Sequence, residues 1–384
     1  MQFKRLVLQN WRNFVRVDLS IGERLFITGP NASGKSNLLD AFRFLRDVAK
    51  TGGGLQQAVN DRGGLSRLRC LAARRYPDVE IEVELEETNN GTPTTWRYSL
   101  GLRQESRGAR RLLLAHERAW RNAEKLLERP NEDDRRDEWR LTQTHLEQIA
   151  SNVAFRPVAE TFQRILYLHL VPQLLKHPNL ANREALSEDP FGLKFLERVM
   201  GTPEKTRRAR LGKIEEALRI AVPELEELGD TRDVRGMPHL EAVYRHWRPH
   251  AGRQREDQFS DGTLRMIGLL WSLPEGDGLL LLEEPELSLH SQIVSKLPAL
   301  IWRLQRARKR QVMLSSHSAE LFGDRGIRPH EVALLCPQGS EGTVVKLAAD
   351  KDDVRRLLEG GMTMADAVLP LTAPTQVEQL MLFE

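Results

Sequence analysis

Hydrophobic and polar positions alternate at the start of the chain in a way that predicts strands. Residues Phe3 to Leu8 and Phe14 to Leu19 follow a period of two, and a short apolar run from Leu25 to Thr28 stops at Gly29. From Lys35 the apolar residues recur at helical spacing as far as the glycines at 52–54. The opening therefore predicts three strands, a glycine-containing loop and a helix.

The next segment predicts a hairpin, and a charged stretch follows it. Val79 to Leu85 alternates strictly, a turn is expected at 89–91, and a returning strand is expected around Thr95 to Leu102. From about Arg118 to Arg219 the pattern becomes helical and heavily charged, with recurrent proline. This stretch predicts an insertion of short helical segments and not one long coiled coil.

The α/β pattern returns after Val222. A strand is expected at Leu240 to Trp247, before a polar, basic loop that ends near Gln258. The remaining pattern predicts strands at 279–282, 311–315, 332–335 and 343–347, an amphipathic helix at 289–304 and a short helix at 352–358. We therefore predict an α/β fold whose first part spans 1–105 and whose second part spans 236–369. A helical, charged insertion at 106–235 separates the two parts, and 370–384 forms a tail.

The composition is that of a folded protein and gives little further indication of function, and we expect the protein to be cytoplasmic. The chain has 384 residues and a formal charge of +3, which by itself does not indicate nucleic acid. Only Cys70 and Cys336 occur, too far apart to suggest a disulfide framework or a zinc site, so both are expected to be buried, inert thiols. The start of the chain does not resemble a signal peptide, and no apolar stretch approaches the roughly 20 residues of a membrane helix.

The glycine loop carries the strongest chemical signal. It fits the pattern G-x-x-x-x-G-K-[ST] and lies between a predicted strand and a predicted helix. Backbone amides and the helix start can surround phosphate oxygens, Lys35 can reach the β- and γ-phosphates, and the Ser36 hydroxyl can bind Mg²⁺. The residues expected to contact the nucleotide here are Gly29, Pro30, Asn31, Ala32, Ser33, Gly34, Lys35, Ser36 and Asn37.

Two carboxylates end the apolar strand predicted at 279–282. Glu283 is placed to act on the metal side, and Glu284 is placed to polarise an attacking water. An ordinary strand end with solvated acids is the alternative interpretation.

Two further segments gain a functional interpretation because the chain also contains these motifs. Ser260 and Gly262 directly precede an amphipathic helix, where a serine can cap the helix and the following amides can bind an anion. His317 follows the strand at 311–315, from which it could face the γ-phosphate. Taken alone, the first segment is only a helix cap and the second only a histidine in the core or at the surface.

Together these segments resemble the ABC-type ATPases of the SMC, RecF and OLD group, including the compact bacterial ATPases of the AAA family. Gly29 to Ser36 resembles the Walker A motif and 279–284 the Walker B motif. Phe259 to Thr263 resembles the signature motif, 288–290 the D-loop and His317 the switch histidine. The start at 8–14 is similar to the "NFR" strand of the RecF-like branch.

The resemblance implies an ATPase head with a mixed sheet and an N-terminal antiparallel sheet, which uses ATP and Mg²⁺. It also implies a homodimer joined through ATP, because the signature serine of one copy completes the nucleotide site of the other. Glu283, Asp261 and His290 depart from the residues most usual at their positions in the wider family. The Q-loop glutamine has Gln56 and Gln57 as candidates, and Arg62 to Gly64 could occupy that place instead.

The purpose of the ATP stays open between two interpretations. Clusters of arginine could neutralise DNA phosphates, although nearby acids make solvated surfaces equally plausible. In the first interpretation the protein gates DNA or a separately encoded effector or nuclease in repair or phage defence. In the second it is an assembly scaffold with slow turnover and no DNA contact. Asp350 and Asp352 match a nuclease pattern, but Asp350 is expected to cap the helix at 352–358 instead.

Overall fold

The computed structural model describes residues 1–51, 54–73, 78–89, 91–105, 108, 110–176, 192, 194–248 and 252–373. The chain forms two compact units. The first unit contains Met1–Leu166, Asp277–Leu281 and Lys309–Glu384, and the second contains Tyr167–Gly276 and Leu282–Arg308. Within the described residues, no helix is long and apolar enough to cross a bilayer.

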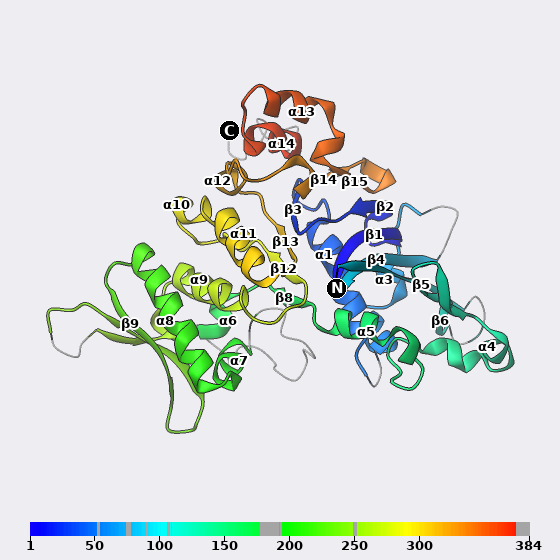
Figure 1. Cartoon of the computed structure of the whole chain (residues 1–384), viewed down its shortest axis with the longest axis horizontal. Helices are drawn as coiled ribbons and strands as arrows, with labels where there is room; N and C mark the ends of the chain where they lie inside the picture. Colours follow the sequence, from blue (N-terminus) through cyan, green and yellow to red (C-terminus); the bar gives the residue numbers. More distant parts are fainter. Residues whose placement is uncertain are drawn as a thin grey trace, which may run out of the picture. The chain divides into compact units, whose positions relative to one another are not determined.

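An antiparallel sheet makes up one part of the first unit (Figure 1). Its strand order is β2-β1-β4-β5-β6-β7. The strands are β1 (Gln2–Trp11), β2 (Phe14–Ser20), β4 (Val79–Asn89), β5 (Thr92–Gln104), β6 (Leu112–Arg121) and β7 (Glu124–Arg129). In β4, Val79, Ile81, Val83 and Leu85 are buried while the glutamates between them are partly exposed, as the period of two predicts. The predicted hairpin is confirmed.

A mixed sheet makes up the other part of the first unit. β3 (Arg24–Thr28) lies between β13 (Val312–Ser315) and β14 (Val332–Pro337) and is parallel to both, while β15 (Thr343–Leu347) is antiparallel to β14. All five residues of β3 are buried, as expected for a strand inside a covered parallel sheet. β12 (Leu280–Glu283) begins beside β13, where the Leu280 amide donates to the Gln311 carbonyl at 3.0 Å.

Helices complete the first unit, and α1 (Lys35–Val48) is the longest of those described in it. Its apolar side chains Leu38, Leu39, Phe42 and Leu45 are fully buried, which confirms the helical periodicity after Lys35. The others are α2 (Gly54–Asn60), α3 (Leu65–Leu68), α4 (Glu132–Arg136), α5 (Arg156–Gln163), α12 (Ala319–Phe322), α13 (Asp352–Glu359) and α14 (Met364–Val368).

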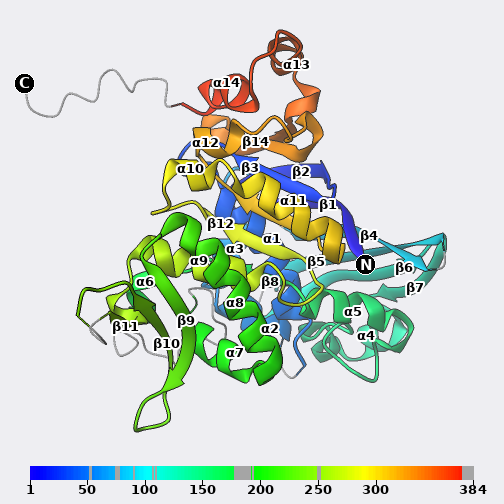
Figure 2. The same ribbon diagram turned by 60° about the vertical axis from the view of Figure 1, so that its left-hand side comes forward.

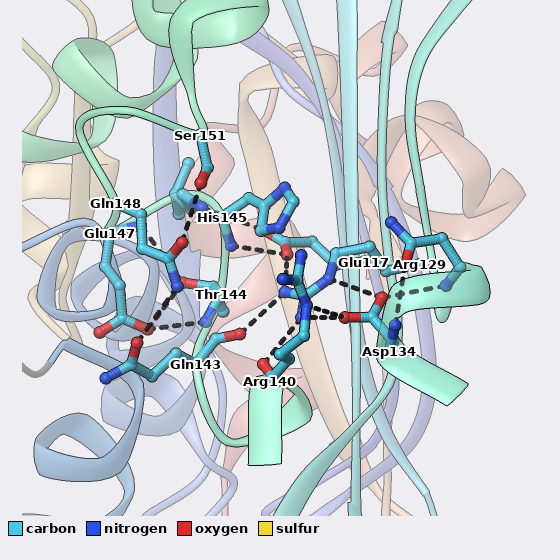
Figure 3. A network of polar contacts seen from close by, with 12 residues as sticks. Glu117, Arg129, Asp134, Arg140, Gln143, Thr144, His145, Glu147, Gln148 and Ser151 are labelled. Carbon is cyan, nitrogen blue, oxygen red and sulfur yellow. Dashed lines mark hydrogen bonds and ion pairs between the residues drawn. The ribbon is translucent and has the colours of Figure 1, made fainter. Parts of the chain in front are cut away.

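A buried polar network ties the segment after β7 to the antiparallel sheet (Figure 3). The Arg129 guanidinium is 1% exposed and makes a bidentate pair with Asp134, at 2.8 and 3.0 Å. It also donates to Glu117 at 3.1 Å and to the carbonyls of Arg140 and Gln143. Every strong donor of the guanidinium is thus used, which is the condition under which a buried arginine is tolerated.

The second unit packs helices against a small sheet of order β11-β10-β9. Both views show α8 lying along β9 (Figure 2). Trp271 is fully buried, with the Phe195 ring edge-on at 6.5 Å and the Arg210 guanidinium 5.3 Å from its ring centroid. The elements are α6 (Pro172–Lys176), α7 (Phe195–Gly201), α8 (Glu204–Ala221), β9 (Leu225–Arg232), β10 (Pro238–Tyr244), β11 (Arg253–Arg255), α9 (Asp261–Ser272), α10 (Ser291–Val294) and α11 (Leu297–Arg308).

The purely helical description of the stretch from Arg118 to Arg219 is wrong in its first part. β6 and β7 extend the antiparallel sheet through this region, and the short strand β8 (Leu166–Leu168) follows. The charges misled the prediction because an antiparallel strand can also place charged residues on its solvent side. Arg118 is such a residue, with 41% of its side chain exposed. Helices α5 to α8 confirm the rest of the helical prediction, and the boundaries 106–235 stay a prediction.

Three smaller expectations are also wrong. The predicted helix at 289–304 is divided into α10 and α11, because Pro298 has no amide hydrogen with which to continue a helix from α10. The basic loop before Gln258 contains β11, which pairs with β10. Asp350 does not cap α13: the N-cap residue is Lys351, and no side chain caps this helix.

Other expectations meet the structure only in part. Cys70 is buried as expected, whereas Cys336 is partly exposed. The glycines at 52 and 53, the middle of the turn expected at 89–91 and most of the tail, 374–384, lie outside the described residues.

Candidate functional site

The loop Gly29–Ser36, here called the phosphate loop, joins β3 to α1 in the first unit. Ala32 and Gly34 have φ values of 61° and 100°, so the chain passes twice through the left-handed region. Gly34 is the N-cap residue of α1, and no side chain caps the helix start. Because the first amides of a helix have no partner within the helix, such an uncapped start favours an anion.

Lys35 is folded over the phosphate loop. Its ammonium nitrogen lies 3.2 Å from the carbonyl oxygens of both Gly29 and Pro30, and the residue is 8% exposed. A polyphosphate entering the loop would offer this ammonium group charged oxygens, which are stronger acceptors than carbonyls.

Buried hydroxyls gather where β3 and β13 end. The Oγ1 atom of Thr28 and the Oγ atoms of Ser33 and Ser315 are buried without a hydrogen-bond partner among the described residues. The two strands are parallel neighbours, with Ser315 opposite Ile27. The carboxyl ends of parallel strands are the usual place for ligands in α/β sheets. Buried polar atoms without partners at this edge fit a site for a polar ligand.

His317 lies at the same edge of the sheet as the phosphate loop. It comes directly after β13, where the Ser316 amide donates to the Ile27 carbonyl at 3.0 Å. Ser318 then caps α12 by accepting from the Leu321 amide at 3.1 Å. The sequence prediction that placed His317 at a strand tip is confirmed. Its role toward a γ-phosphate stays a prediction.

The acidic strand end, Glu283 and Glu284, belongs to the second unit. The Glu283 carboxylate accepts a short hydrogen bond from the Tyr167 hydroxyl, and its carbonyl oxygen is 3.3 Å from the Nδ1 atom of His169. Glu284 has a φ of 43°, a left-handed conformation that is uncommon for a residue with a side chain. Backbone strain of this kind clusters at functional sites, which makes Glu284 a candidate on structural grounds.

The signature segment lies in the same unit and is ordered around a helix cap. Ser260 is the N-cap residue of α9, and its Oγ atom accepts from the Thr263 amide at 3.1 Å, as the sequence predicts. A Cβ atom on Gly262 would lie 2.5 Å from the Ser288 carbonyl oxygen, so this glycine permits close contact with the D-loop segment. Gln173 and Lys176 each hold the Asp261 carboxylate at 2.7 Å.

Sequence reasoning did not find Tyr167 and His169. They alternate with Leu166 and Leu168, so a strand pattern was present, but their contact with Glu283 joins residues more than 100 positions apart. It also assigned no role to Asn13, whose side-chain amide donates to the Ser33 carbonyl of the phosphate loop at 2.6 Å. The side chain of Asn37, which is expected to contact the nucleotide, donates to Asn13 at 2.9 Å, and its contact with a nucleotide stays a prediction.

The Q-loop candidates take part in the fold. The Gln56 amide donates to the Thr142 carbonyl at 2.7 Å, and Gln57 donates to Asp61. Arg62 pairs with Asp40 at 2.8 Å and with Asp47 at 2.9 Å. Burial alone would raise the pKa of Asp40, but the charge and hydrogen bond of Arg62 together with the charges of Arg43 and Arg12 outweigh it, and the pKa of this carboxyl is lowered.

A metal would have few protein ligands here. Among the described residues, no three histidine, cysteine or acidic side chains gather in one group. Ser36 belongs to the first unit and Glu283 to the second, so their shared role as Mg²⁺ ligands stays a prediction.

Comparison with known proteins identifies the family. The model of the family described as "AAA domain, putative AbiEii toxin, Type IV TA system" matches residues 25–323, from β3 to the end of α12. The chain belongs to this family. A second family model, described as the P-loop containing region of AAA domain, matches residues 3–46 of this AAA-domain protein. The match covers β1 to β3, the phosphate loop and most of α1.

Curated relatives match a part of the chain. The AAA-domain protein is similar to the DNA replication and repair protein RecF of Brucella abortus, with 35% identity over 89 residues, and to that of Synechocystis sp., with 29% over 90 residues. These matches cover 21% and 23% of this chain, and it spans only about a fifth of the RecF proteins.

The fold resembles the Smc head bound to the C-terminal winged-helix domain of ScpA, with a TM-score of 0.54 and 14% identity. The alignment covers 94% of this chain and 100% of the other. The AAA-domain protein also resembles the Smc head from Pyrococcus furiosus bound to the C-terminal domain of ScpA, with a TM-score of 0.50 and 14% identity. That alignment covers 94% and 99% of the two chains. The fold is that of a P-loop ATPase head of the ABC type.

Proposed function

We propose that this protein binds ATP with Mg²⁺ in the phosphate loop and hydrolyses it in sites completed by two copies of the chain. The observation that carries this proposal is the uncapped start of α1, with Lys35 folded over the loop and three unpartnered buried hydroxyls nearby. Such a loop offers amides, a helix start and one ammonium group, which together suit the phosphates of a nucleotide.

Each candidate residue then has a distinct task. Ser36 and Glu283 would hold Mg²⁺, which neutralises charge on the phosphates during the transfer. Glu284 would accept the proton of a water whose oxygen forms a bond to the γ-phosphorus, while the bond to the ADP oxygen breaks. His317 would donate a hydrogen bond to the transferred phosphoryl group. The left-handed backbone conformation of Glu284 supports this proposed role, because backbone strain clusters at functional sites.

The second copy would supply Ser260. Ser260 caps the start of α9, and Gly262 lets this helix start approach the D-loop segment closely, which supports a role for the segment at the partner's nucleotide. ATP would then join two heads because the joined state binds it more tightly than the separate copies do, and hydrolysis would release them.

The test is whether an ATP-bound dimer can be trapped. Glu284→Gln should keep ATP affinity, lose hydrolysis and sediment as a dimer in MgATP, whereas wild-type protein should return to monomers as ATP is consumed. Lys35→Ala should bind no nucleotide and stay monomeric. Equal ATPase rates for wild type and Glu284→Gln would refute the role of Glu284. Absence of ATP binding by wild-type protein would refute the function.

We further propose that ATP turnover gates DNA or a separately encoded effector in DNA maintenance or phage defence. The exposed side of α11 supports the proposal that the protein binds DNA. Arg303, Arg306 and Arg308 are exposed, and none has a carboxylate within 4.0 Å among the described residues. The Arg306 guanidinium lies 5.0 Å from the centroid of the half-exposed Trp302 ring. Unpaired arginines beside an aromatic ring suit the phosphates and bases of nucleic acid.

Arginine also clusters at 107–111, 135–140, 207–210 and 245–255. These clusters favour the alternative, a nucleotide-dependent scaffold without DNA contact. Each contains arginines already paired with acids, such as Arg111 with Glu105 at 2.7 Å and Arg208 with Glu204 at 2.6 Å. DNA binding measured from low to high salt separates the two functions. We expect a combined Arg303→Gln and Arg306→Gln variant to bind DNA more weakly and with a smaller salt dependence. Arg208→Gln is the matched control. No binding by wild type at low salt would favour the scaffold.

A further inference from the structure

Asn13 uses its whole side-chain amide at the phosphate loop. It lies in the turn between β1 and β2, and its Nδ2 atom donates to the Ser33 carbonyl at 2.6 Å and to the Thr343 hydroxyl at 2.9 Å. Its Oδ1 atom accepts from the Asn37 amide at 2.9 Å. Since a side-chain amide has two donor hydrogens, both donors of Asn13 are occupied.

The backbone around Asn13 is held as well. Its carbonyl oxygen accepts from the Thr343 amide at 2.8 Å, and a Cβ atom on Gly342 would lie 2.7 Å from the same oxygen. The start of β15 therefore packs directly on Asn13. On the other side, the Trp11 indole donates to the Asn37 carbonyl at 2.8 Å in the first turn of α1. Through Asn13 and Trp11, the start of β15 and the end of β1 are thus connected to the phosphate loop and to the first turn of α1.

The bond to Ser33 constrains one particular peptide group. In a trans peptide the carbonyl oxygen and the next amide hydrogen point in opposite directions. Holding the Ser33 carbonyl toward Asn13 therefore turns the Gly34 amide hydrogen away from Asn13, to the other side of the loop. Gly34 has a φ of 100°, and a glycine next to a peptide group gives that group unusual freedom to rotate. The bond from Asn13 restricts this rotation.

The contact with Gly34 itself is close. A Cβ atom on Gly34 would lie 2.3 Å from the Nδ2 atom and 2.4 Å from the Oδ1 atom of Asn13. Asn13 thus packs on the loop at the residue that ends it and begins α1.

We propose that Asn13 is a positioning residue for phosphate binding, which keeps the Gly34 amide directed at the phosphates of a nucleoside triphosphate. This inference rests on the proposed ATP-binding function, and it adds a residue outside the loop to which no role has been assigned. Asn13 touches no substrate in this proposal and acts through the Ser33 carbonyl. Its removal should weaken phosphate binding more than it weakens the fold.

The experiment measures ATP affinity and thermal unfolding of the full chain, using the matched variants Asn13→Ala and Asn10→Ala. Asn10 is 3% exposed, lies in β1 just before the turn that contains Asn13, and donates to the Asp78 carbonyl at 2.8 Å. Loss of a hydrogen bond that orders a binding group typically weakens binding about 10-fold. We expect a loss of this size for Asn13→Ala, and an unchanged affinity for Asn10→Ala even if it unfolds at a lower temperature.

Two further variants keep the test decisive if Asn13→Ala does not fold. Thr343→Val removes only the hydroxyl that fixes Asn13 and should weaken ATP binding about 3-fold, whereas Thr343→Ser should restore it. Affinities within 2-fold of wild type for Asn13→Ala, or for Thr343→Val if it alone folds, would overturn this inference and leave the proposed function intact. A wild-type chain that does not bind ATP would overturn both.

Discussion

Replacing Arg129 by methionine tests how the buried network of Figure 3 holds the first unit together. Methionine keeps much of the length of the side chain but removes all its hydrogen bonds to Asp134, Glu117 and two carbonyls. Two carboxylates that are fully buried would then face each other without the intervening positive charge. Removing one partner of a buried ion pair typically costs about 3–5 kcal/mol, because the remaining charge is neither hydrated nor paired.

The structure allows a bound on this cost. An unpaired buried carboxylate can escape by taking up a proton, which at pH 7 costs an aspartate about 4 kcal/mol given its ordinary pKa near 3.9. Glu117 keeps hydrogen bonds from Tyr98 and from the amides of His145 and Leu146, and Asp134 keeps those from the Asn131 amide and the Arg140 guanidinium. The expected decrease in the free energy of unfolding is therefore about 3–5 kcal/mol at pH 7.

The effect should depend on pH in a definite direction. In the wild type, burial would raise the pKa of Asp134, but hydrogen bonds from Arg129 and neighbouring groups outweigh it and the pKa is lowered. A lowered carboxyl pKa stabilises the fold above the unfolded pKa, and the stabilisation is lost as pH falls through the folded pKa. In the variant, the proton that the unpaired buried carboxyl takes up costs about 1.4 kcal/mol less for each pH unit of acidification, so the difference between variant and wild type should shrink to about 1–2 kcal/mol near pH 5.

Urea unfolding followed by circular dichroism at pH 7 and pH 5 makes the measurement. Arg136→Met is the control, because the Arg136 side chain is 77% exposed and lies 3.9 Å from Asp133, a pair expected to contribute at most about 1 kcal/mol. The reasoning is refuted if Arg129→Met unfolds at the same urea concentration as Arg136→Met, or if its loss of stability is larger at pH 5 than at pH 7.

Three other predictions concern two histidines and two glycines. Burial, with a smaller effect of nearby arginines, lowers the pKa of His116 and of His145 to about 4, so the folded chain binds fewer protons than the unfolded chain between about pH 4 and 6.5. Stability should therefore fall on acidification through this range, and His116→Gln should flatten the slope of the unfolding free energy against pH. Gly262→Ala should lower the ATPase rate at least 10-fold without weakening ATP binding to the single chain, because the added methyl would meet the Ser288 carbonyl at 2.5 Å. Gly212→Ala, in the middle of α8 with open space around it, should instead stabilise the protein by about 0.5–1 kcal/mol and keep full activity.

Local patterns predicted the elements that carry the candidate site. The apolar run before Gly29 and the periodicity after Lys35 placed the phosphate loop correctly between β3 and α1, because both signals depend only on neighbours in sequence. Ser260 before an amphipathic helix predicted the cap of α9 for the same reason.

Contacts between distant segments could not be predicted in this way. Tyr167 reaches Glu283, and Asn13 reaches Ser33, only after strands have paired. The solvent side of β6 also misled the helical prediction, because charge density does not distinguish a helix from the exposed side of a sheet. Sequence patterns thus found the motif residues and missed the side chains that support them.

Mixing two inactive variants tests most directly whether two copies complete each ATP site. Lys35→Ala disables the phosphate loop of its own chain, and Ser260→Arg disables the signature segment that would serve the partner. Each variant alone should have no ATPase activity. In an equimolar mixture, random pairing gives mixed dimers with one intact site, and about a quarter of the wild-type rate should return. If the mixture stays as inactive as the separate variants, the sites are not shared between chains and the account is contradicted.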